Sequence, residues 1–213
     1  MPIEEPECYR SVLAAGLNDL GIEAGNQQLS ALLEYLKLLA KWNKSYNLSG
    51  IREMSEMVTL HLLDSLAIAP YIDGDVVLDV GSGAGLPGIP LAIIYPQKKF
   101  ILVDSNGKKY RFLFAVKTAL DLENVSLINS RIQDYQCDEQ IDIVVSRAFS
   151  SLSEIAALGN SVFGPTTRIF AMKGNYPGPE IEHLPATSEV IRETKLMVPG
   201  LAANRYLLEL KSK

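Results

Sequence analysis

The chain has 213 residues, of which 47% are hydrophobic and 21% charged, and its formal net charge is −5. This balance excludes a disordered, collagenous or coiled-coil chain and gives one domain enough apolar residues for a sizeable core. The negative charge argues against a protein that binds naked nucleic acid through bulk electrostatics, although it permits a local basic face.

Neither a membrane span nor a metal site is predicted. The longest apolar run, 89–95, contains Pro90 and is far shorter than the ~20 residues that cross a bilayer. The stretch 1–7 carries three glutamates and no basic residue, unlike a secretory signal, so we expect a cytoplasmic protein. Cys8 and Cys137 have no Cys or His neighbours at ligand spacing, which predicts two free thiols.

Residues 1–72 are predicted to form a helical extension that makes one compact unit with the rest of the chain. Between 27 and 44, leucines recur at three- and four-residue spacing, which places them on one face of an amphipathic helix: Leu29, Leu32, Leu33, Leu36 and Leu39. A second helical pattern runs from about Ser55 to Ala69, and Pro70 is predicted to end it.

Residues 73–213 show a different pattern, in which short β-rich runs alternate with helical stretches. The predicted strands are 76–80, 100–103, 125–128, 141–145 and 168–172, and the predicted helices are 87–94, 108–120 and 152–161. This alternation predicts an α/β domain with a mostly parallel, doubly wound sheet. Two final β-rich runs, 190–198 and 206–210, are predicted to pair as antiparallel strands at the C-terminal edge.

A glycine-rich turn, 81–88, follows the first strand, and Asp104 ends the second strand 23 residues after Gly81. Glycines bring a backbone close to a ligand, and an acid at this distance is placed to bind ribose hydroxyls. Gly83-x-Gly85-x-x-Gly88 fits a dinucleotide fingerprint, whereas Gly81-x-Gly83-x-Gly85 fits an S-adenosylmethionine loop. Asp79 favours the second fit, because a carboxylate suits a cationic methionine end and repels a pyrophosphate.

The stretch Asp79–Leu91 resembles the signature of the bacterial 16S rRNA guanine-N7 methyltransferases of the RsmG/GidB family. Further stretches resemble the same family in order, from about residue 35 to the C-terminus: 42–44 with 47–48, 61–65, 104–109, 146–152, 172–174 and 198–199. Leu60 and Tyr206 depart from the pattern, since the family usually has arginine and histidine there. The first departure removes one expected RNA contact, and neither affects the cofactor loop.

The resemblance implies a class I, Rossmann-like methyltransferase fold with N-terminal helices and S-adenosylmethionine as cofactor. It implies methyl transfer to N7 of a guanine at position 527, in the 530-loop region of 16S rRNA within the small ribosomal subunit. The resemblance also implies which residues contact the cofactor. They are Asp79 and the glycine loop at the methionine end, residues at the ribose, residues at the adenine, and one arginine: Asp79, Gly81, Gly83, Gly85, Leu86, Asp104, Ser105, Asn106, Ile132, Gln133 and Arg147.

No residue is expected to act as an acid or base, because guanine N7 carries a lone pair and no proton. Arg147, Phe149 and Lys173 are instead expected to position the base. His61 and Asp64 share one helix face, which we interpret as structural or RNA-facing rather than catalytic. Candidate RNA contacts are the following: Lys44, Arg52, His61, Lys108, Lys109 and Lys173. We expect a monomer that binds no metal and no membrane.

Two other functions remain open from the sequence. A nicotinamide-dependent oxidoreductase would use the dinucleotide reading of the glycines, although no Tyr-x-x-x-Lys or His–Asp hydride-transfer arrangement is evident. A non-catalytic module that binds only cofactor or RNA would be expected to lose part of the loop, yet Asp79, Gly81–Gly85 and Asp104 are all intact.

Overall fold

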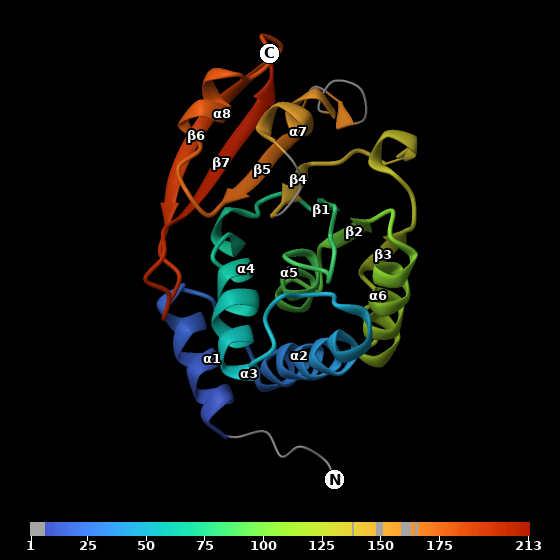
Figure 1. Ribbon diagram of the computed structural model, residues 1–213, viewed down its shortest axis with the longest axis vertical. Helices are drawn as coiled ribbons and strands as arrows, with labels where there is room; N and C mark the ends of the chain where they lie inside the picture. Colours follow the sequence, from blue (N-terminus) through green and yellow to red (C-terminus); the bar gives the residue numbers. More distant parts are fainter. Residues whose placement is uncertain (1–6, 138, 148–150, 159–162, 165) are drawn as a thin grey trace.

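The computed structural model describes residues 7–137, 139–147, 151–158, 163–164 and 166–213, and a seven-stranded sheet runs through it (Figure 1). The strand order is β3-β2-β1-β4-β5-β7-β6. The strands are β1 Val76–Val80, β2 Lys99–Val103, β3 Val125–Ile128, β4 Ile143–Ser146, β5 Arg168–Lys173, β6 Ser188–Leu196 and β7 Arg205–Ser212. Strands β1 to β5 pair in parallel, and β7 is antiparallel to both of its neighbours, which confirms the predicted fold class.

Helices cover both faces of this sheet. They are α1 Glu7–Asp19, α2 Asn26–Tyr46, α3 Met54–Met57, the π-helix η1 Val58–Leu63, α4 Asp64–Leu66, α5 Gly88–Ile94, α6 Gly107–Ala119, α7 Leu152–Leu158 and α8 Gly178–Glu182, with 3₁₀ turns η2 Ala69–Tyr71 and η3 Ile132–Asp134. Residues 159–161 of the predicted helix 152–161 lie outside the described residues.

The predicted helix 55–69 runs without a break from Met54 to Leu66, but its hydrogen-bond pattern changes along its length. Its central part is the π-helix η1, and Pro70 lies inside the 3₁₀ turn η2 rather than at the end of an α-helix. Strand β4 begins at Ile143, two residues later than predicted. The carboxylate of Asp142, just before it, accepts N–H bonds from Asp75 and Val76 at 2.8 and 2.9 Å. The spacing of apolar residues is the same for these alternatives, so it could not predict the π-helix, the 3₁₀ turn or the start of β4.

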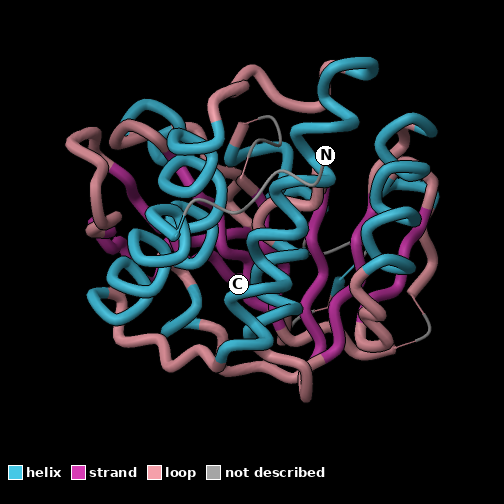
Figure 2. Tube along the Cα trace, turned by 90° about the horizontal axis from the view of Figure 1, so that it is seen from below, coloured by secondary structure: helices cyan, strands magenta, loops and turns pink. Residues whose placement is uncertain are grey.

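The N-terminal helices belong to the main hydrophobic core rather than to an appendage. Leu36 and Leu62 are completely buried in the same cluster as Val77 and Phe100 of the sheet. Seen from below, these helices cross in front of the strands (Figure 2). The opposite face packs instead on α7, η3 and α8. Because the core is shared, we propose that regions 1–72 and 73–213 fold as one unit.

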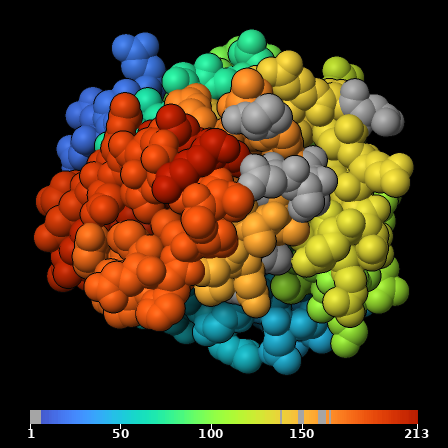
Figure 3. All heavy atoms as spheres, turned by 90° about the horizontal axis from the view of Figure 1, so that it is seen from above, coloured from blue at the N-terminus to red at the C-terminus, as the bar shows by residue number. Residues whose placement is uncertain are grey.

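The C-terminal hairpin returns to the N-terminal helices. Its strands occupy the upper face of the molecule (Figure 3), and the connection 197–204 descends beside α1 and α4 (Figure 1). At Gly200 an added Cβ would lie 3.5 Å from Thr59 Oγ1, so the backbone passes close to η1. This return brings the start of β7 next to residues from the first third of the chain.

A hydrogen bond also joins helix α2 to the glycine-rich turn. The hydroxyl of Tyr35, which is completely buried, donates a hydrogen bond of 2.7 Å to the carbonyl of Ala84. Burial raises the pKa of Tyr35, so the phenol stays protonated and remains a donor. A residue of the N-terminal region therefore fixes the turn after β1.

Replacing Tyr35 by phenylalanine is expected to lower the free energy of unfolding by about 1–2 kcal/mol, because the carbonyl of Ala84 loses its partner while the ring remains. Urea denaturation followed by circular dichroism measures the change. Tyr46→Phe is the matched control, since Tyr46 lies in the same helix with 38% exposure and its ring contact with Trp42 is kept. Equal unfolding midpoints for the two variants would contradict this role for Tyr35.

Candidate functional site

The carboxyl ends of β1, β2 and β4 meet at one edge of the sheet. Parallel pairing places Val80 opposite Val103, and Asp79 opposite Val145. Ligands of open α/β sheets bind at this kind of edge, where the strand order reverses. The predicted residues of the glycine loop, of the end of β2 and of the end of β4 are therefore brought together.

Three glycines give the turn after β1 its shape. Gly81, Gly83 and Gly85 have φ values of 68°, 60° and 88°, in the left-handed region that side chains disfavour. A Cβ at Gly85 would lie 2.5 Å from Ile89, whereas a Cβ at Gly83 would meet nothing closer than 3.8 Å. Gly85 is thus required by packing, whereas a Cβ at Gly83 would make only ordinary contacts with Gly81 O and Lys109 Nζ.

Asp104 joins the end of β2 to this turn. Its Oδ2 accepts the N–H of Gly83 at 2.9 Å, and its Oδ1 accepts the N–H of Asn106 at 2.8 Å. Lys109 Nζ lies 3.4 Å from Oδ2. The carboxylate is 8% exposed and still has lone pairs for a ligand, while the neighbouring Ser105 and Asn106 are exposed.

Asp79 lies below the turn, inside the protein. It is 1% exposed, its Oδ2 accepts the N–H of Gly88 at 2.8 Å, and its Oδ1 has no hydrogen-bond partner among the described residues. Burial raises the pKa of Asp79 to about 7, against a smaller lowering by the Gly88 bond and the charge of Arg147. A positive group near this carboxylate would favour its ionised form.

A cavity of about 360 Å³ opens in front of the turn. Its lining combines the turn with an arginine, a lysine and a loop from the N-terminal region: Leu48, Ser49, Gly50, Ile51, His61, Gly81, Ser82, Gly83, Ala84, Leu86, Lys109 and Arg147. Residues 48–51 form one wall of this cavity and were not predicted as site residues. In the sequence, only the family-like stretch 47–48 pointed to them.

The wall is held by a chain of hydrogen bonds that ends at His61. Asn43 binds the backbone of Ser49 and Ile51, and Ser49 Oγ lies 2.7 Å from His61 Nε2. Because His61 Nδ1 faces the carbonyl of Leu60 at 3.2 Å, Nδ1 carries the proton and Nε2 accepts from Ser49. Burial, with the charge of Arg147, lowers the pKa of His61 to about 4, so its ring is neutral at pH 7.

Arg147 is fixed where β4 ends. Its Nη1 donates to the carbonyl of Leu60 at 3.0 Å and to Asp64 Oδ2 at 3.3 Å. The other oxygen of Asp64 accepts from Arg205 Nε at 2.7 Å. His61 and Asp64 therefore make separate contacts, in agreement with a structural reading of the pair. Arg205 was not assigned from the sequence.

The residues predicted to contact the adenine follow β3, and those predicted to position the target base follow β4 and end β5. Ile132 is buried and Gln133 exposed in η3, which follows β3. Phe149 lies outside the described residues. Lys173 at the end of β5 forms an ion pair of 2.8 Å with Glu180. The same carboxylate accepts the N–H of Leu152 at 2.7 Å, so it also fixes the start of α7.

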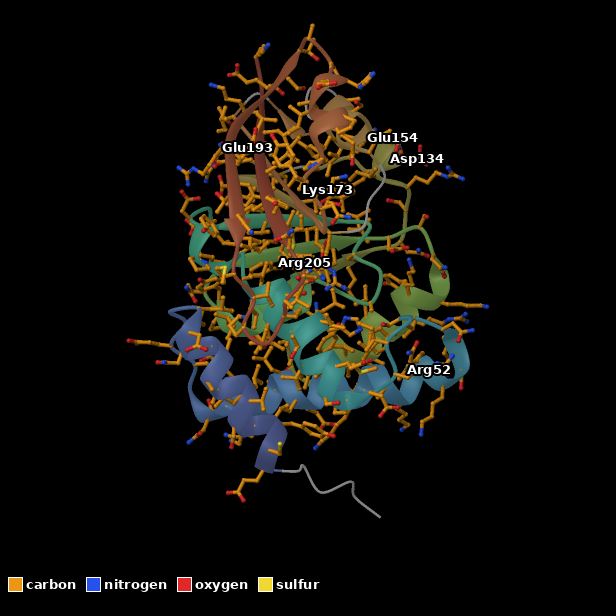
Figure 4. All side chains as sticks on the ribbon, turned by 60° about the vertical axis from the view of Figure 1, so that its left-hand side comes forward. Arg52, Asp134, Glu154, Lys173, Glu193 and Arg205 are labelled. Carbon is orange, nitrogen blue, oxygen red and sulfur yellow. The ribbon has the colours of Figure 1, made fainter. Side chains whose placement is uncertain are left out.

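The remaining predicted RNA contacts lie around the cavity rather than in one cluster. Lys44 and Arg52 are exposed near the end of α2, and Arg52 is far from Lys173 and Arg205 (Figure 4). Lys108 is exposed in the first turn of α6, whereas Lys109 turns back toward Asp104. Within the described residues there is no group of three His, Cys, Asp or Glu that could hold a metal ion, and no helix long and apolar enough to cross a membrane.

Comparison with solved structures shows the fold of known methyltransferases. The crystal structure of ribosomal protein L11 methylase from Lactobacillus delbrueckii subsp. bulgaricus superposes with a TM-score of 0.54 at 16% identity, over 71% of this chain and 77% of that chain. Trm5b from Pyrococcus abyssi gives a TM-score of 0.53 at 14% identity, over 74% of this chain and 49% of that chain. At these identities the likeness is one of fold alone.

Sequence comparison is more specific. The family model described as rRNA small subunit methyltransferase G matches residues 28–208. Ribosomal RNA small subunit methyltransferase G of Pseudomonas aeruginosa (strain LESB58) is 48% identical over 200 residues, which is 93% of this chain and 94% of the relative. The protein of that name from Nitrosococcus oceani is 44% identical over 203 residues, or 95% of each chain. The chain therefore belongs to the rRNA small subunit methyltransferase G family, which confirms the resemblance found in its motifs.

Proposed function

We propose that this protein transfers a methyl group from S-adenosylmethionine to N7 of the guanine at position 527, in the 530-loop region of 16S rRNA in the small ribosomal subunit. Membership of the family makes the chain an S-adenosylmethionine-dependent methyltransferase of 16S rRNA. The match over residues 28–208 is the observation that carries the proposal. The atom and the nucleotide come from the family resemblance.

The site fits this cofactor by three of its own features. Gly83 has no side chain that would keep a ligand from the backbone, Asp104 offers carboxylate lone pairs at the end of β2, and Asp79 Oδ1 is a buried acceptor without a described partner. A pyrophosphate would be repelled by Asp79 once this carboxyl is ionised. The nicotinamide alternative has no comparable support.

Each predicted contact then has a role. Asp104 accepts from the ribose hydroxyls, with Ser105 and Asn106 beside it. The turn around Gly81, Gly83, Gly85 and Leu86 holds the methionine end, and Asp79 favours its positive charge. Ile132 and Gln133 frame the adenine after β3.

The bound cofactor supplies a methyl group on a positively charged sulfur, which is a strong electrophile. The chain has to hold guanine N7 in line with this methyl group, at ~3–3.5 Å, and to exclude water. His61 does not serve as a base, because its pKa is about 4 and both ring nitrogens are occupied. Arg147 reads O6 or the Watson–Crick edge, since binding N7 itself would block the nucleophile. Phe149 is proposed to stack on the base and Lys173 to help position it.

The lysines and the arginine around the cavity are proposed to contact RNA phosphates: Lys44, Arg52, Lys108, Lys109 and Lys173. His61 was expected in this group, but it is buried, neutral at pH 7 and paired at both ring nitrogens, so we assign it to the cavity wall. Because the net charge of the whole chain is −5, the rest of the protein repels RNA, and these local contacts have to overcome that repulsion. We therefore propose a monomer that works in the cytoplasm on the folded subunit and binds naked RNA weakly, with a strong dependence on salt.

A methyl-transfer assay tests the reaction. Small subunits from a strain that lacks the modification are incubated with labelled S-adenosylmethionine, and the label is located by cleavage at N7-methylguanine. We expect label at one guanine of the 530-loop region. The Asp104→Asn variant is the control for contaminating enzymes and should transfer label far more slowly, because the ribose contact is weakened.

Label at another nucleotide would contradict the proposed target. Absence of label from the wild-type protein, with cofactor binding still measurable, would contradict the proposed substrate while leaving the cofactor site intact.

The cofactor affinity is expected to rise with pH. A pKa of about 7 leaves Asp79 about half protonated at neutral pH, and a cation favours its charged form. The affinity should therefore increase up to about tenfold between pH 6 and 8 and then level off. The Asp79→Asn variant should bind more weakly at pH 8 and lose most of this dependence.

Calorimetry with S-adenosylmethionine at pH 6, 7 and 8 measures these affinities. Asp19→Asn is the control, since Asp19 is exposed at the end of α1 and should leave the wild-type pH profile unchanged. The amino group of the cofactor titrates equally in all three proteins, so the difference between profiles reports on Asp79. Parallel profiles for wild type and Asp79→Asn would exclude this role.

A further inference from the structure

Asp64 holds two arginines that come from distant parts of the chain. Its Oδ1 accepts from Arg205 Nε at 2.7 Å, and its Oδ2 accepts from Arg147 Nη1 at 3.3 Å. The carboxylate side chain is 7% exposed, and each arginine side chain is 21% exposed. We call these three residues the Asp64 cluster. They join α4, the end of β4 and the start of β7.

The cluster carries an excess positive charge. Two guanidinium groups share the Asp64 carboxylate, and His61, whose pKa is about 4, adds no charge at pH 7. Asp79 also interacts with the charge of Arg147, but its pKa of about 7 leaves it only about half ionised at neutral pH. The nearby lysines have their own carboxylates, since Lys173 pairs with Glu180 and Lys109 with Asp104. A partly buried excess charge is costly unless an anion compensates it. The electrostatics therefore favour an anionic ligand at this place.

The donors of the cluster are only partly used. The described contacts involve Nη1 of Arg147, which binds Leu60 and Asp64, and Nε and Nη1 of Arg205, which bind Asp64 and the carbonyl of Asn204. Nε and Nη2 of Arg147 and Nη2 of Arg205 have no hydrogen-bond partner among the described residues. Planar guanidinium donors suit the paired oxygens of a phosphate or a carboxylate.

The two arginines face different surroundings. Arg147 lines the cavity in front of the glycine turn, whereas Arg205 is absent from its lining. Arg205 lies instead beside the end of β5, where an added Cβ at Gly174 would be 3.8 Å from its Nη1, and Figure 4 places it near Lys173. The cluster thus extends from the cofactor cavity toward the C-terminal hairpin, on the side away from Asp104.

We propose that Arg205, oriented by Asp64, binds the RNA phosphate that adjoins the target guanosine, beside the base that Arg147 reads. The inference rests on the proposed function, because it requires an RNA substrate at this edge. Arg205 is then a substrate-binding residue, and Asp64 is a positioning residue that fixes both guanidinium groups. An RNA phosphate is favoured over the cofactor carboxylate because Arg205 lies outside the cofactor cavity.

The test compares Arg205→Gln with wild type in methyl transfer to small subunits at several salt concentrations, together with calorimetry of S-adenosylmethionine binding. Loss of one phosphate contact should lower kcat/KM for subunits about tenfold at low salt and reduce the slope of log(kcat/KM) against log[salt] by about one. The cofactor affinity should stay within twofold of wild type. Arg205→Lys keeps the charge and should restore most of the salt slope.

Arg192→Gln is the matched control. Arg192 lies on β6, its side chain is 62% exposed and its partner is Glu209, so its loss should change neither quantity. The thermal unfolding temperature of each variant, compared with that of wild type, shows whether the fold survives the loss of the Arg205–Asp64 contact. If Arg205→Gln lowers kcat/KM with an unchanged salt slope, or if Arg205→Lys restores nothing, Arg205 is structural and the inference is wrong.

A cofactor affinity that falls tenfold or more in Arg205→Gln would assign the anion to the cofactor carboxylate and would also overturn the inference. The proposed function is judged separately by the wild-type protein. Wild-type label at the expected guanine with an unaffected Arg205→Gln variant would contradict this inference alone, whereas no wild-type transfer would contradict the proposed function.

Discussion

The bond between the Asp104 carboxylate and the N–H of Gly83 is the contact on which the rest of the site depends. It ties the end of β2 to the turn after β1 at 2.9 Å and fixes the carboxylate beside the backbone of Gly83. Charge-assisted bonds of this kind are short and directional. In the proposed site, one unit of the structure would hold both the ribose and the methionine ends of the cofactor and so set the position of the transferred methyl group.

The N-terminal helices complete this unit. Tyr35 holds the turn from one side through Ala84, and the Asn43–Ser49–His61 chain builds the opposite wall of the cavity. The C-terminal hairpin adds Arg205 through Asp64. Elements from both ends of the chain therefore surround the proposed site for cofactor and base. This arrangement explains why the helical region shares a core with the sheet.

The sequence predicted those parts of the structure that depend on local pattern. Strands β1 and β3 have the predicted bounds, and α2 extends the predicted helix by one or two residues, because apolar spacing and the glycine turn are local signals. The π-helix at Val58–Leu63 was missed, since its apolar spacing resembles that of an α-helix. The Asp64–Arg205 contact joins residues 141 positions apart, and no pattern in a single sequence marks such a pair.

The electrostatics of the site fit the proposed reaction, which uses no acid or base. Burial keeps His61 neutral, and Arg147 is fixed by a carbonyl and a carboxylate rather than left free to bind N7. The protein contributes position and charge, which suffices for a nucleophile that has no proton to lose. The acidic remainder of the surface then limits binding to substrates that engage several local contacts at once.

A crystal structure of the protein with S-adenosylhomocysteine would show whether this edge of the sheet is the cofactor site. We expect the ribose hydroxyls within hydrogen-bond distance of Asp104 and the sulfur beside the Gly81–Gly85 turn, facing Arg147. A ligand bound elsewhere, or one whose ribose is held without Asp104, would contradict this expectation.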